Sequence, residues 1–182
     1  MNMDEYLEPT PAIDADHPSV VAYARAATAG ASDPRTRAIR LYGAVRDDVR
    51  YDPYVLDLSV HGMCASATLA AKRGWCVSKA VLLAACARAE DIPARLGFAD
   101  VRNHLSTERL RAAMGTDVFV YHGNTELWLG ERWVKATPAF NAELCAKFGV
   151  APLEFDGEHD SLLQEHDGQR RAFEIDLAPA QR

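Results

Sequence analysis

The sequence has 182 residues, of which 48% are hydrophobic and 25% are charged, and its formal net charge is −6. This length and apolar content are typical of one globular domain that forms its own core, so disulfide bonds are not required for stability. The negative charge and the lack of any Lys/Arg-rich run argue against nonspecific binding to nucleic acid, which needs a positive field.

The N-terminus has neither a basic segment nor an apolar stretch, and no run approaches the roughly 20 apolar residues of a membrane span. Neither a secretory signal nor a membrane anchor is therefore predicted. The cysteines are few and irregularly spaced, which is typical of reduced thiols in a cytoplasmic protein. They are Cys64, Cys76, Cys86 and Cys145.

Two helices are predicted in the first 50 residues. Asp16 is placed to cap a first helix that runs to about Ala29 and stops at Gly30. Asp33-Pro34 is a clearer helix start, because Asp is a good N-cap and Pro fits the first helical position. Apolar residues then recur every four positions, which extends this second helix to about Arg50.

The most distinctive segment follows a short predicted helix over 66–72 that is ended by Gly74. From Val77 to Ala87 the chain is apolar on nearly every side once past Lys79, and it contains no Pro or Gly. Such a helix is usually buried in the centre of a domain.

The pattern changes to β after Pro93, and Gly130-Glu131 suits a two-residue hairpin with Gly first. Helices followed by an antiparallel meander predict an α+β fold, with the N-terminal helices and the central helix packed on an antiparallel sheet. We expect a single domain over 1–182, with an N-terminal helical part at 16–50, a core at about 40–140 and an acidic tail at 151–182. The later predicted elements are strands at 95–101, 117–122, 126–129 and 132–136, and helices at 107–114 and 141–148, which end at Gly115 and Gly149.

Cys76 lies at the predicted first turn of the central helix. The partial positive charge and free N–H groups of a helix N-terminus favour the thiolate, which is the nucleophilic form of cysteine, and the N–H groups can also hold an oxyanion. Trp75 is placed to wall such a site or to donate its indole N–H, although a packing role is an equal alternative. Cys86 and Cys145 are interpreted as core residues.

A thiolate enzyme also needs a base, and His122 is the best candidate because it closes the apolar strand that precedes it. The end of a strand can direct a side chain into a cleft. The other histidines lie in predicted loops, beside a polar stretch or in the acidic tail. They are His17, His61, His104, His159 and His166.

Three blocks resemble the transglutaminase-like family, in the form found in bacterial papain-like cysteine protease domains. The run Arg73–Ala80, continued by Ala87–Arg95, resembles the family's nucleophile segment, in which Gly-x-Cys opens a long helix and Gly-Ile-Pro-Ala-Arg follows it. His122 with Glu126 four residues on resembles the family's histidine strand, and Gly130 with Trp133-Val134 the hairpin after it. Val49–Asp52 resembles the x-x-Tyr-Asp lead-in.

The resemblance covers about residues 40–140 and implies a papain-like α+β core with cysteine, histidine and usually aspartate in that chain order. Thr137 stands where the family has the aspartate, and Asp91 stands where it has the Gly before Ile-Pro. A Thr hydroxyl can accept a hydrogen bond from imidazole but adds no negative charge. Thr137, Asn141 and Asp156 are therefore alternative partners for His122.

The resemblance implies amide chemistry, in which Cys76 forms a thioester that water or an amine resolves. We expect a peptide or small amide as substrate, and hydrolysis rather than transfer because water is in excess. A degenerate domain that serves as a binding module is the alternative, and Thr137 supports it. No cofactor is expected, since the acidic run 156–160 lacks the Gly and Glu of a calcium loop and no Cys-x-x-Cys pair suggests zinc.

The predicted site also implies an unusually acidic thiol. The helix N-terminus and a protonated His122 together are expected to lower the pKa of Cys76 from about 8.5 into the range of about 4–7. Cys76 alone would then react quickly with iodoacetamide below neutral pH.

Overall fold

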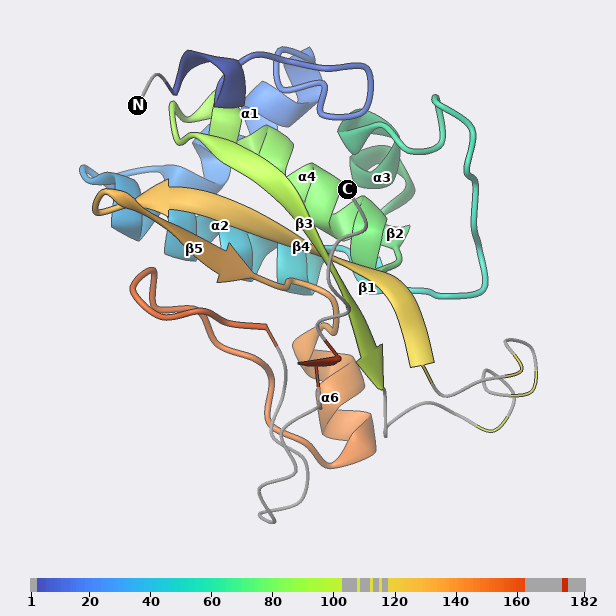
Figure 1. The fold of residues 1–182 in the computed structure, drawn as a ribbon. Helices are drawn as coiled ribbons and strands as arrows, with labels where there is room; N and C mark the ends of the chain where they lie inside the picture. Colours follow the sequence, from blue (N-terminus) through green and yellow to red (C-terminus); the bar gives the residue numbers. More distant parts are fainter. Residues whose placement is uncertain are drawn as a thin grey trace.

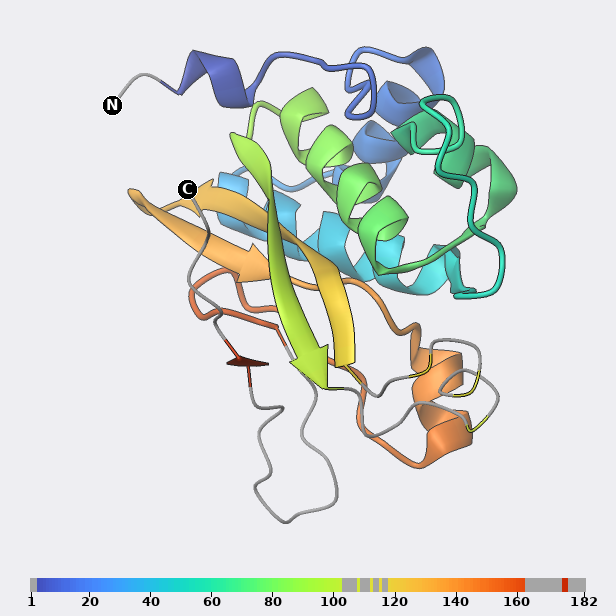
Figure 2. The ribbon, with the colours of Figure 1, turned by 45° about the vertical axis from the view of Figure 1, so that its right-hand side comes forward.

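The computed structural model of the protein describes residues 3–102, 108, 112, 115, 118–162 and 175–176. Figures 1 and 2 show a layer of helices on one face of a curved sheet. The buried helix α4 (Cys76–Ala89) lies between the sheet and the other helices of that layer. This is the α+β arrangement that the sequence predicts, with the N-terminal helices and the central helix packed on an antiparallel sheet.

The helices begin and end close to the predicted positions. The segment Asp4–Tyr6 forms one turn of 3-10 helix, η1. The α-helices are α1 (Pro18–Thr28), α2 (Pro34–Asp48), α3 (Ala65–Ala71), α4 (Cys76–Ala89) and α6 (Ala142–Phe148).

The ends of these helices follow the local sequence, with two corrections. The Asp33 side chain accepts from the Thr36 N–H at 2.9 Å, as expected of an N-cap that precedes Pro34. The first helix is capped by His17 and not by Asp16, because the His17 ring accepts from the backbone of Ser19. Lys72, with φ of 51°, takes the left-handed position that ends α3, where Gly74 was expected.

The main sheet has the order β5-β4-β3-β6, and all of its pairings are antiparallel. A second, two-stranded sheet pairs β1 and β2 in parallel and brings Tyr51 beside Gly74. The sequence did not predict this small sheet. The strands are β1 (Arg50–Tyr51), β2 (Arg73–Gly74), β3 (Ala94–Arg102), β4 (Val118–Leu129), β5 (Arg132–Ala136) and β6 (Ile175–Asp176).

The two strands predicted on either side of residues 123–125 are a single strand, β4. Residues 123–125 pair in register with residues 96–98 of β3, so the chain does not turn there. The irregularity lies earlier in β4, where the β3–β4 register shifts between Ala99 and Val101 and Tyr121 has φ of 56°. The Tyr121 N–H donates to the Asp100 carboxylate at 3.0 Å, which holds the irregular residue to the neighbouring strand. A period-2 pattern cannot reveal such a bulge, because the bulge changes which residues share a face.

The hairpin between β4 and β5 is confirmed at Gly130 and Glu131. Both residues have positive φ, 57° and 67°, which is the backbone of a type I′ turn rather than of the turn with Gly at the first position alone. The left-handed conformation costs a non-glycine residue such as Glu131 roughly 1–2 kcal/mol.

The core is built around α4, whose residues from Cys76 to Arg88 are all buried. It contacts α1, α2 and α3 on one side and β3 and β4 on the other, which explains why its sequence is apolar all round. Its buried polar residues are Ser78, Lys79 and Arg88. Lys79 is fully buried, and its ammonium donates to the carbonyls of Arg46, Val49 and Ala139 at 2.6–2.9 Å.

Some predicted features lie outside the described residues, namely most of the helix over 107–114 and the acidic tail beyond 162 apart from β6. That the chain is one domain over 1–182 remains a prediction. In the part of the chain that the structure describes, no helix combines the length and the apolar character needed to cross a membrane.

Candidate active site

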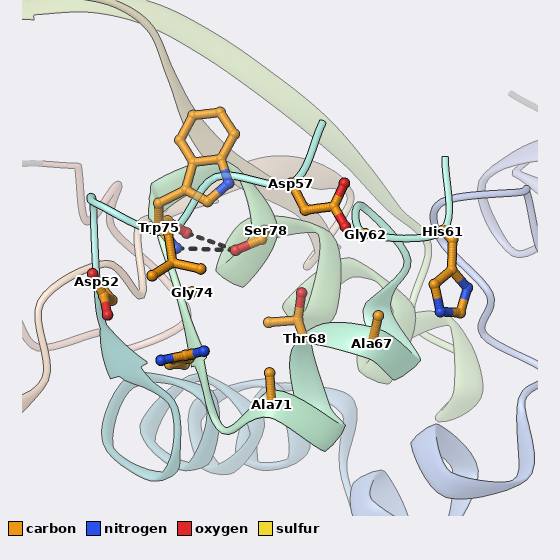
Figure 3. Close-up of a pocket in the computed structure, with 12 residues that line it drawn as sticks. Asp52, Asp57, His61, Gly62, Ala67, Thr68, Ala71, Gly74, Trp75 and Ser78 are labelled. Carbon is orange, nitrogen blue, oxygen red and sulfur yellow. Dashed lines mark hydrogen bonds between the residues drawn. The ribbon is translucent and has the colours of Figure 1, made fainter. Parts of the chain in front are cut away.

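Cys76 is the first residue of α4, directly after the N-cap Trp75. The start of the helix is fixed by Ser78, whose hydroxyl accepts from the Trp75 N–H at 3.0 Å and donates to the Trp75 carbonyl at 3.2 Å, as the dashed lines in Figure 3 show. The sulfur therefore sits at the N-terminal end of a buried helix, where backbone N–H groups without helical partners point outward.

Gly74 is needed because of a close approach and not because of a turn. A Cβ at this position would lie 2.4 Å from the Ser78 hydroxyl oxygen and 3.2 Å from Cγ2 of Thr68. Its backbone pairs with β1, where the Asp52 N–H donates to the Gly74 carbonyl at 2.9 Å. The absence of a side chain thus lets β2 pack against α3 and α4 one residue before Trp75.

Strand β4 crosses the N-terminal end of α4 at Gly123. A Cβ on Gly123 would meet Val77 Cα at 2.9 Å, which is too close for any larger residue. The backbone N–H groups of Gly123, Val77 and Cys76 itself act to lower the pKa of Cys76, because they favour its thiolate. The residue that follows His122 therefore packs against the helix turn that carries the candidate nucleophile.

His122 lies on β4 opposite Ala99 of β3 and is partly buried. Burial lowers the pKa of His122 from 6.5 to about 4, so the ring is neutral at pH 7. Among the described residues, no hydrogen bond joins the imidazole to the Cys76 sulfur, and the link between helix and strand runs through the Gly123 backbone.

The expectation of an acidic Cys76 thiol is wrong. Burial raises the pKa of Cys76 above that of an ordinary thiol, and the backbone N–H groups of Gly123, Val77 and Cys76 only reduce that rise. Cys76 is 6% exposed, so loss of hydration outweighs the helix N-terminus. With His122 neutral as well, the resting pair is thiol and imidazole, not an ion pair.

Tyr51 of β1 pairs with Gly74, which lies two residues before Cys76. Burial raises the pKa of Tyr51, and the charge of a Cys76 thiolate would raise it further. Its ring packs edge-to-face on Phe140 with centroids 4.7 Å apart. The sequence signal for Tyr51 was its place in the lead-in before Asp52, but nothing in that pattern indicated that it pairs with the strand that precedes Cys76.

Thr137 follows β5 and is buried. Its hydroxyl has no hydrogen-bond partner in the described part of the chain, so it does not hold the His122 ring here. Its backbone is well anchored: the N–H donates to the Ser161 carbonyl at 2.9 Å, and the carbonyl accepts from the Tyr42 hydroxyl at 3.2 Å.

The two other candidate partners of His122, Asn141 and Asp156, are hydrogen-bonded to other groups. The Asn141 side-chain oxygen accepts from the Tyr51 N–H at 3.2 Å, which joins β1 to the start of α6. The Asp156 carboxylate contacts the His159 ring at 2.8 Å on an exposed loop. In this structure none of the three oxygens is hydrogen-bonded to the His122 ring among the described residues.

Asn124, two residues after His122, was missed by sequence reasoning. It is buried, its Oδ1 has no hydrogen-bond partner in the described chain, and the amide lies over Gly97, where a Cβ would come within 2.6 Å of it. Alternate residues of a strand share a face, so Asn124 belongs to the same face of β4 as His122. The only available signal was that spacing of two.

A pocket of about 270 Å³ opens beside Trp75. Figure 3 shows Asp52 on one side of Gly74 and Asp57 on the other, with Ser78 and Thr68 between them and Trp75 at one edge. Arg73 and His61 also line it. Sequence reasoning missed this pocket, because the segment 54–64 was not assigned to any element.

The described residues contain no group of three or more His, Cys, Asp or Glu that could hold a metal ion. Within the calcium-like run 156–160, the Asp156 carboxylate accepts from the backbone N–H groups of Glu158 and His159. Arg35 binds the same loop through the Asp156 carbonyl and the Glu158 carboxylate.

The chain matches the family model of the transglutaminase-like superfamily over residues 21–138. Among solved structures it is similar to a putative cysteine protease from Cytophaga hutchinsonii, with a TM-score of 0.59 and 19% identity over 75% of this chain. It is also similar to a putative protease from Parabacteroides distasonis, with a TM-score of 0.47 and 14% identity over 74% of this chain. No curated protein matches.

The matched regions make up 41% of the Cytophaga chain and 25% of the Parabacteroides chain, so this chain spans less than half the length of each. The similarity to the Cytophaga structure confirms the predicted papain-like α+β fold.

Proposed function

The chain belongs to the transglutaminase-like superfamily, and from that premise we propose that it is a cysteine-dependent amide hydrolase or acyltransferase. Cys76 is the nucleophile, His122 is the base, and the acyl group passes through a thioester on Cys76. The observation that carries this proposal is the position of Cys76 at the start of a buried helix, against the strand that bears His122.

The first half of the reaction forms the thioester. The thiol proton moves to a ring nitrogen of His122, the sulfur bonds to the amide carbon, and the carbonyl π electrons move to its oxygen. The C–N bond then breaks, and the leaving amine takes the proton from His122. In this proposal the backbone N–H groups of Gly123 and Val77, which favour the thiolate of Cys76, stabilise the negative oxygen.

The second half releases the acyl group. A water molecule gives a proton to His122 and attacks the thioester carbon, and the sulfur leaves and recovers that proton. An amine in place of water would make the reaction a transfer. We favour hydrolysis of a peptide or small amide because water is in excess. We also propose a cytoplasmic setting, because few and irregularly spaced cysteines are typical of proteins kept in their reduced form.

His122 is a weak base in this arrangement. A ring whose pKa is about 4 is neutral at pH 7 and can accept a proton, but general-base catalysis is best when the pKa lies near the working pH. No described hydrogen bond orients the ring. We therefore propose slow turnover, with the histidine and cysteine drawn together when a substrate closes the site, since catalytic hydrogen bonds often tighten only in the complex.

Trapping the thioester tests the proposal. We expect para-nitrophenyl acetate to acylate Cys76 of the wild type, with the adduct found by peptide mass spectrometry and removed by neutral hydroxylamine. His122→Ala should slow acylation by about 10²–10⁴-fold, the usual range for a general base. Cys86→Ser is the matched control and should acylate normally. Acylation of Cys76 at the rate of a simple thiol, with no response to His122→Ala, would reject the enzyme.

The second candidate function is a binding module that has kept the fold without the chemistry. Thr137 in the place of the family's aspartate favours it, as does the missing hydrogen bond between Cys76 and His122 within the described residues. The same trapping experiment separates the two functions, because a binding module forms no His122-dependent thioester.

A further inference from the structure

The pocket beside Trp75 contains polar groups that the proposed reaction does not use. Its walls come from the loop after β1, from α3 and from the start of α4. Two carboxylates, Asp52 and Asp57, line it against one guanidinium, that of Arg73. With His61 counted as neutral, the charge of the lining is therefore negative.

The charges of the pocket are not equally exposed to water. The Asp52 side chain is 16% exposed, whereas the Arg50 guanidinium that lies 3.7 Å from it belongs to a side chain that is 66% exposed. Arg73 and Asp57 are exposed as well. Because water and salt screen an exposed charge more strongly than a shielded one, the charge that dominates inside the pocket is the negative charge of Asp52.

Both carboxylates can accept more hydrogen bonds than they have. The Asp52 carboxylate accepts from the Tyr54 N–H at 3.1 Å, and the Asp57 carboxylate accepts from the Ser59 N–H at 2.9 Å. A carboxylate has lone-pair sites for about four hydrogen bonds. Each of the two acids therefore still offers acceptor sites to a ligand.

Thr68 of α3 points independently to a ligand. The residue is 4% exposed, and its hydroxyl makes no hydrogen bond within the described part of the chain. It lines the pocket, and Figure 3 shows its oxygen directed towards the side where Ser78 and Asp57 lie. The Ser78 hydroxyl is different, because it is bonded to both the N–H and the carbonyl of Trp75. A buried hydroxyl without a partner is uncommon, so the pocket lacks a group that donates to Thr68.

We propose that this pocket binds a primary ammonium group carried on a short alkyl chain. An ammonium has three N–H donors and no acceptor, and Asp52, Asp57 and Thr68 supply acceptor oxygens for it. Trp75 lines the same pocket, and an aromatic ring attracts a cation through its negative face. The ligand class is an alkylammonium, either a small free amine or the side chain of a lysine.

The remaining walls suit the alkyl chain. The volume of about 270 Å³ lies below the 300–1,000 Å³ of pockets for drug-sized ligands, so the pocket has room for one long side chain. Its aliphatic side chains are Val55, Ala67 and Ala71. This binding site does not rest on the function proposed for Cys76, and Cys76→Ala should bind the same ligand as the wild type does.

Titration with n-butylammonium chloride, followed by nuclear magnetic resonance of the labelled full-length protein, tests the site. We expect the Trp75 indole and Gly74 backbone resonances to shift and to saturate at about 1–10 mM, the affinity expected of so small a ligand. The matched probe is n-butanol, which has the same chain without the charge. It should bind at least about tenfold more weakly, since it lacks the charge-assisted hydrogen bonds.

Substitutions assign the binding to the three acceptors and fix the sign of the charge. Asp52→Asn and Asp57→Asn should each weaken binding of n-butylammonium by about tenfold. Thr68→Val should weaken it by about three- to tenfold without disturbing the fold, because the hydroxyl bonds to no other described group. Arg73→Gln should tighten binding by about twofold, because it removes a like charge from the lining.

Asp91→Asn is the matched control. It changes the net charge by the same amount as Asp52→Asn, but Asp91 is exposed beyond the other end of α4 and tolerates Asn at its φ of 57°. Binding should be unchanged. Equal binding of n-butylammonium and n-butanol would overturn the proposal, as would weakening by Asp91→Asn as large as that by Asp52→Asn. Weaker binding after Arg73→Gln, or no saturation below about 50 mM, would also overturn it.

Two peptides distinguish the sources of the ammonium group. They are acetyl-Ala-Lys-Ala amide and the same peptide with norleucine, a neutral side chain, in place of lysine, and both are titrated into Cys76→Ala so that no reaction occurs. A lysine peptide that binds at least as tightly as n-butylammonium, with the norleucine peptide not binding, identifies a lysine side chain as the ligand. Saturable binding of n-butylammonium without binding of the lysine peptide identifies a small free amine.

Discussion

Two opposing effects act on the sulfur of Cys76. Three backbone N–H groups favour the thiolate, while burial in a nearly closed site favours the thiol, and burial is the larger effect. A helix N-terminus is therefore not enough to make a cysteine acidic when water is excluded from it. The consequence is that the proton must be removed during the reaction and not before it.

This balance predicts the pH dependence of labelling. We expect iodoacetamide to react slowly with Cys76 at pH 6 and faster as the pH rises into the alkaline range, because burial raises the pKa of this thiol. His122→Ala should leave this profile almost unchanged, because a neutral imidazole does not stabilise a thiolate, even though the same change slows acylation. Labelling is followed by mass spectrometry of the Cys76 peptide. Rapid labelling at pH 6 that His122→Ala abolishes would instead reveal an ion pair.

Thr137 allows a second test at the scale of one side chain. Its buried hydroxyl has no partner in the described chain, and a buried unsatisfied group costs about 1–3 kcal/mol. We expect Thr137→Val to raise the free energy of unfolding by about 1 kcal/mol, measured by urea denaturation, and to leave acylation of Cys76 unchanged.

The matched control for Thr137 is Thr125, whose hydroxyl donates to the Ala80 carbonyl at 2.8 Å inside the core. Thr125→Val should be destabilising, by about 1 kcal/mol or more. If Thr137→Val instead lowers stability and slows acylation, the hydroxyl orients His122 in the working enzyme.

At the scale of elements, Lys79 joins three parts of the chain. Its ammonium holds the C-terminal end of α2, the residue before β1 and the segment that leads into α6. Replacing it leaves three buried carbonyls without donors, each of which costs about 1–3 kcal/mol, although removing a buried charge recovers part of that loss. We expect Lys79→Met to lower the free energy of unfolding by about 2–4 kcal/mol.

The pH dependence of that loss has a definite sign. Burial lowers the pKa of Lys79 from 10.5 to about 7, so between these values the unfolded chain binds more protons than the folded protein. Stability that depends on Lys79 therefore rises as the pH rises from about 7 towards 10.5. Urea unfolding at pH 7 and pH 9 should show a larger gap between wild type and Lys79→Met at pH 9. Lys72→Met, at an exposed lysine, should show no such gap.

How far the elements could be predicted depends on the range of the interactions that form them. The central helix and the Asp33 cap follow from neighbouring residues alone, and the structure confirms both. The β1–β2 pairing joins Arg50 to Arg73, and no local pattern in either two-residue strand indicates the other. The pocket depends on that pairing, so it too was not predictable from the sequence.

The candidate site, like the fold, could be predicted from the sequence only where local residues determine it. That Cys76 starts a buried helix follows from local sequence, and the roles of Cys76 and His122 remain predictions. The pKa of Cys76 could not be predicted correctly, because it depends on how much water β1 and β4 exclude from the sulfur. The partner of His122 was equally out of reach, since it depends on which buried oxygens the fold leaves unpaired, such as those of Thr137 and Asn124.

At the scale of the molecule, the N-terminal arm, residues 3–15, connects the helical layer to the sheet. Tyr6 packs edge-to-face on Trp133 of β5 with centroids 4.9 Å apart. The Glu8 carbonyl accepts from Arg88 of α4, and the Ala12 carbonyl accepts from the N–H of Ala65 at 3.0 Å. One segment thus contacts elements on both sides of the core.

The arm predicts cooperative unfolding of the two layers. In the Trp75→Phe variant, far-ultraviolet circular dichroism reports on the helices, and tryptophan fluorescence then reports on Trp128 and Trp133 in the sheet, because the third tryptophan, at the N-cap of α4, is removed. The two signals should give one coincident urea transition, as in the wild type. A chain that begins at Ala15 should lose about 2–4 kcal/mol. Tyr6→Ala should lose about 1 kcal/mol, since it removes one aromatic pair. Two separate transitions in the wild type would contradict a single domain.

The contact between Gly123 and Val77 has a consequence for how this protein can change over evolutionary time. Because a single methyl group on Gly123 would meet the backbone of the helix at 2.9 Å, no first step away from glycine is open without moving β4 off the sulfur. A smaller residue at Val77 relieves only the contacts with its side chain. Lineages descended from this sequence are therefore expected to keep glycine at 123 while the surrounding loops diverge, or to lose it together with the chemistry of Cys76.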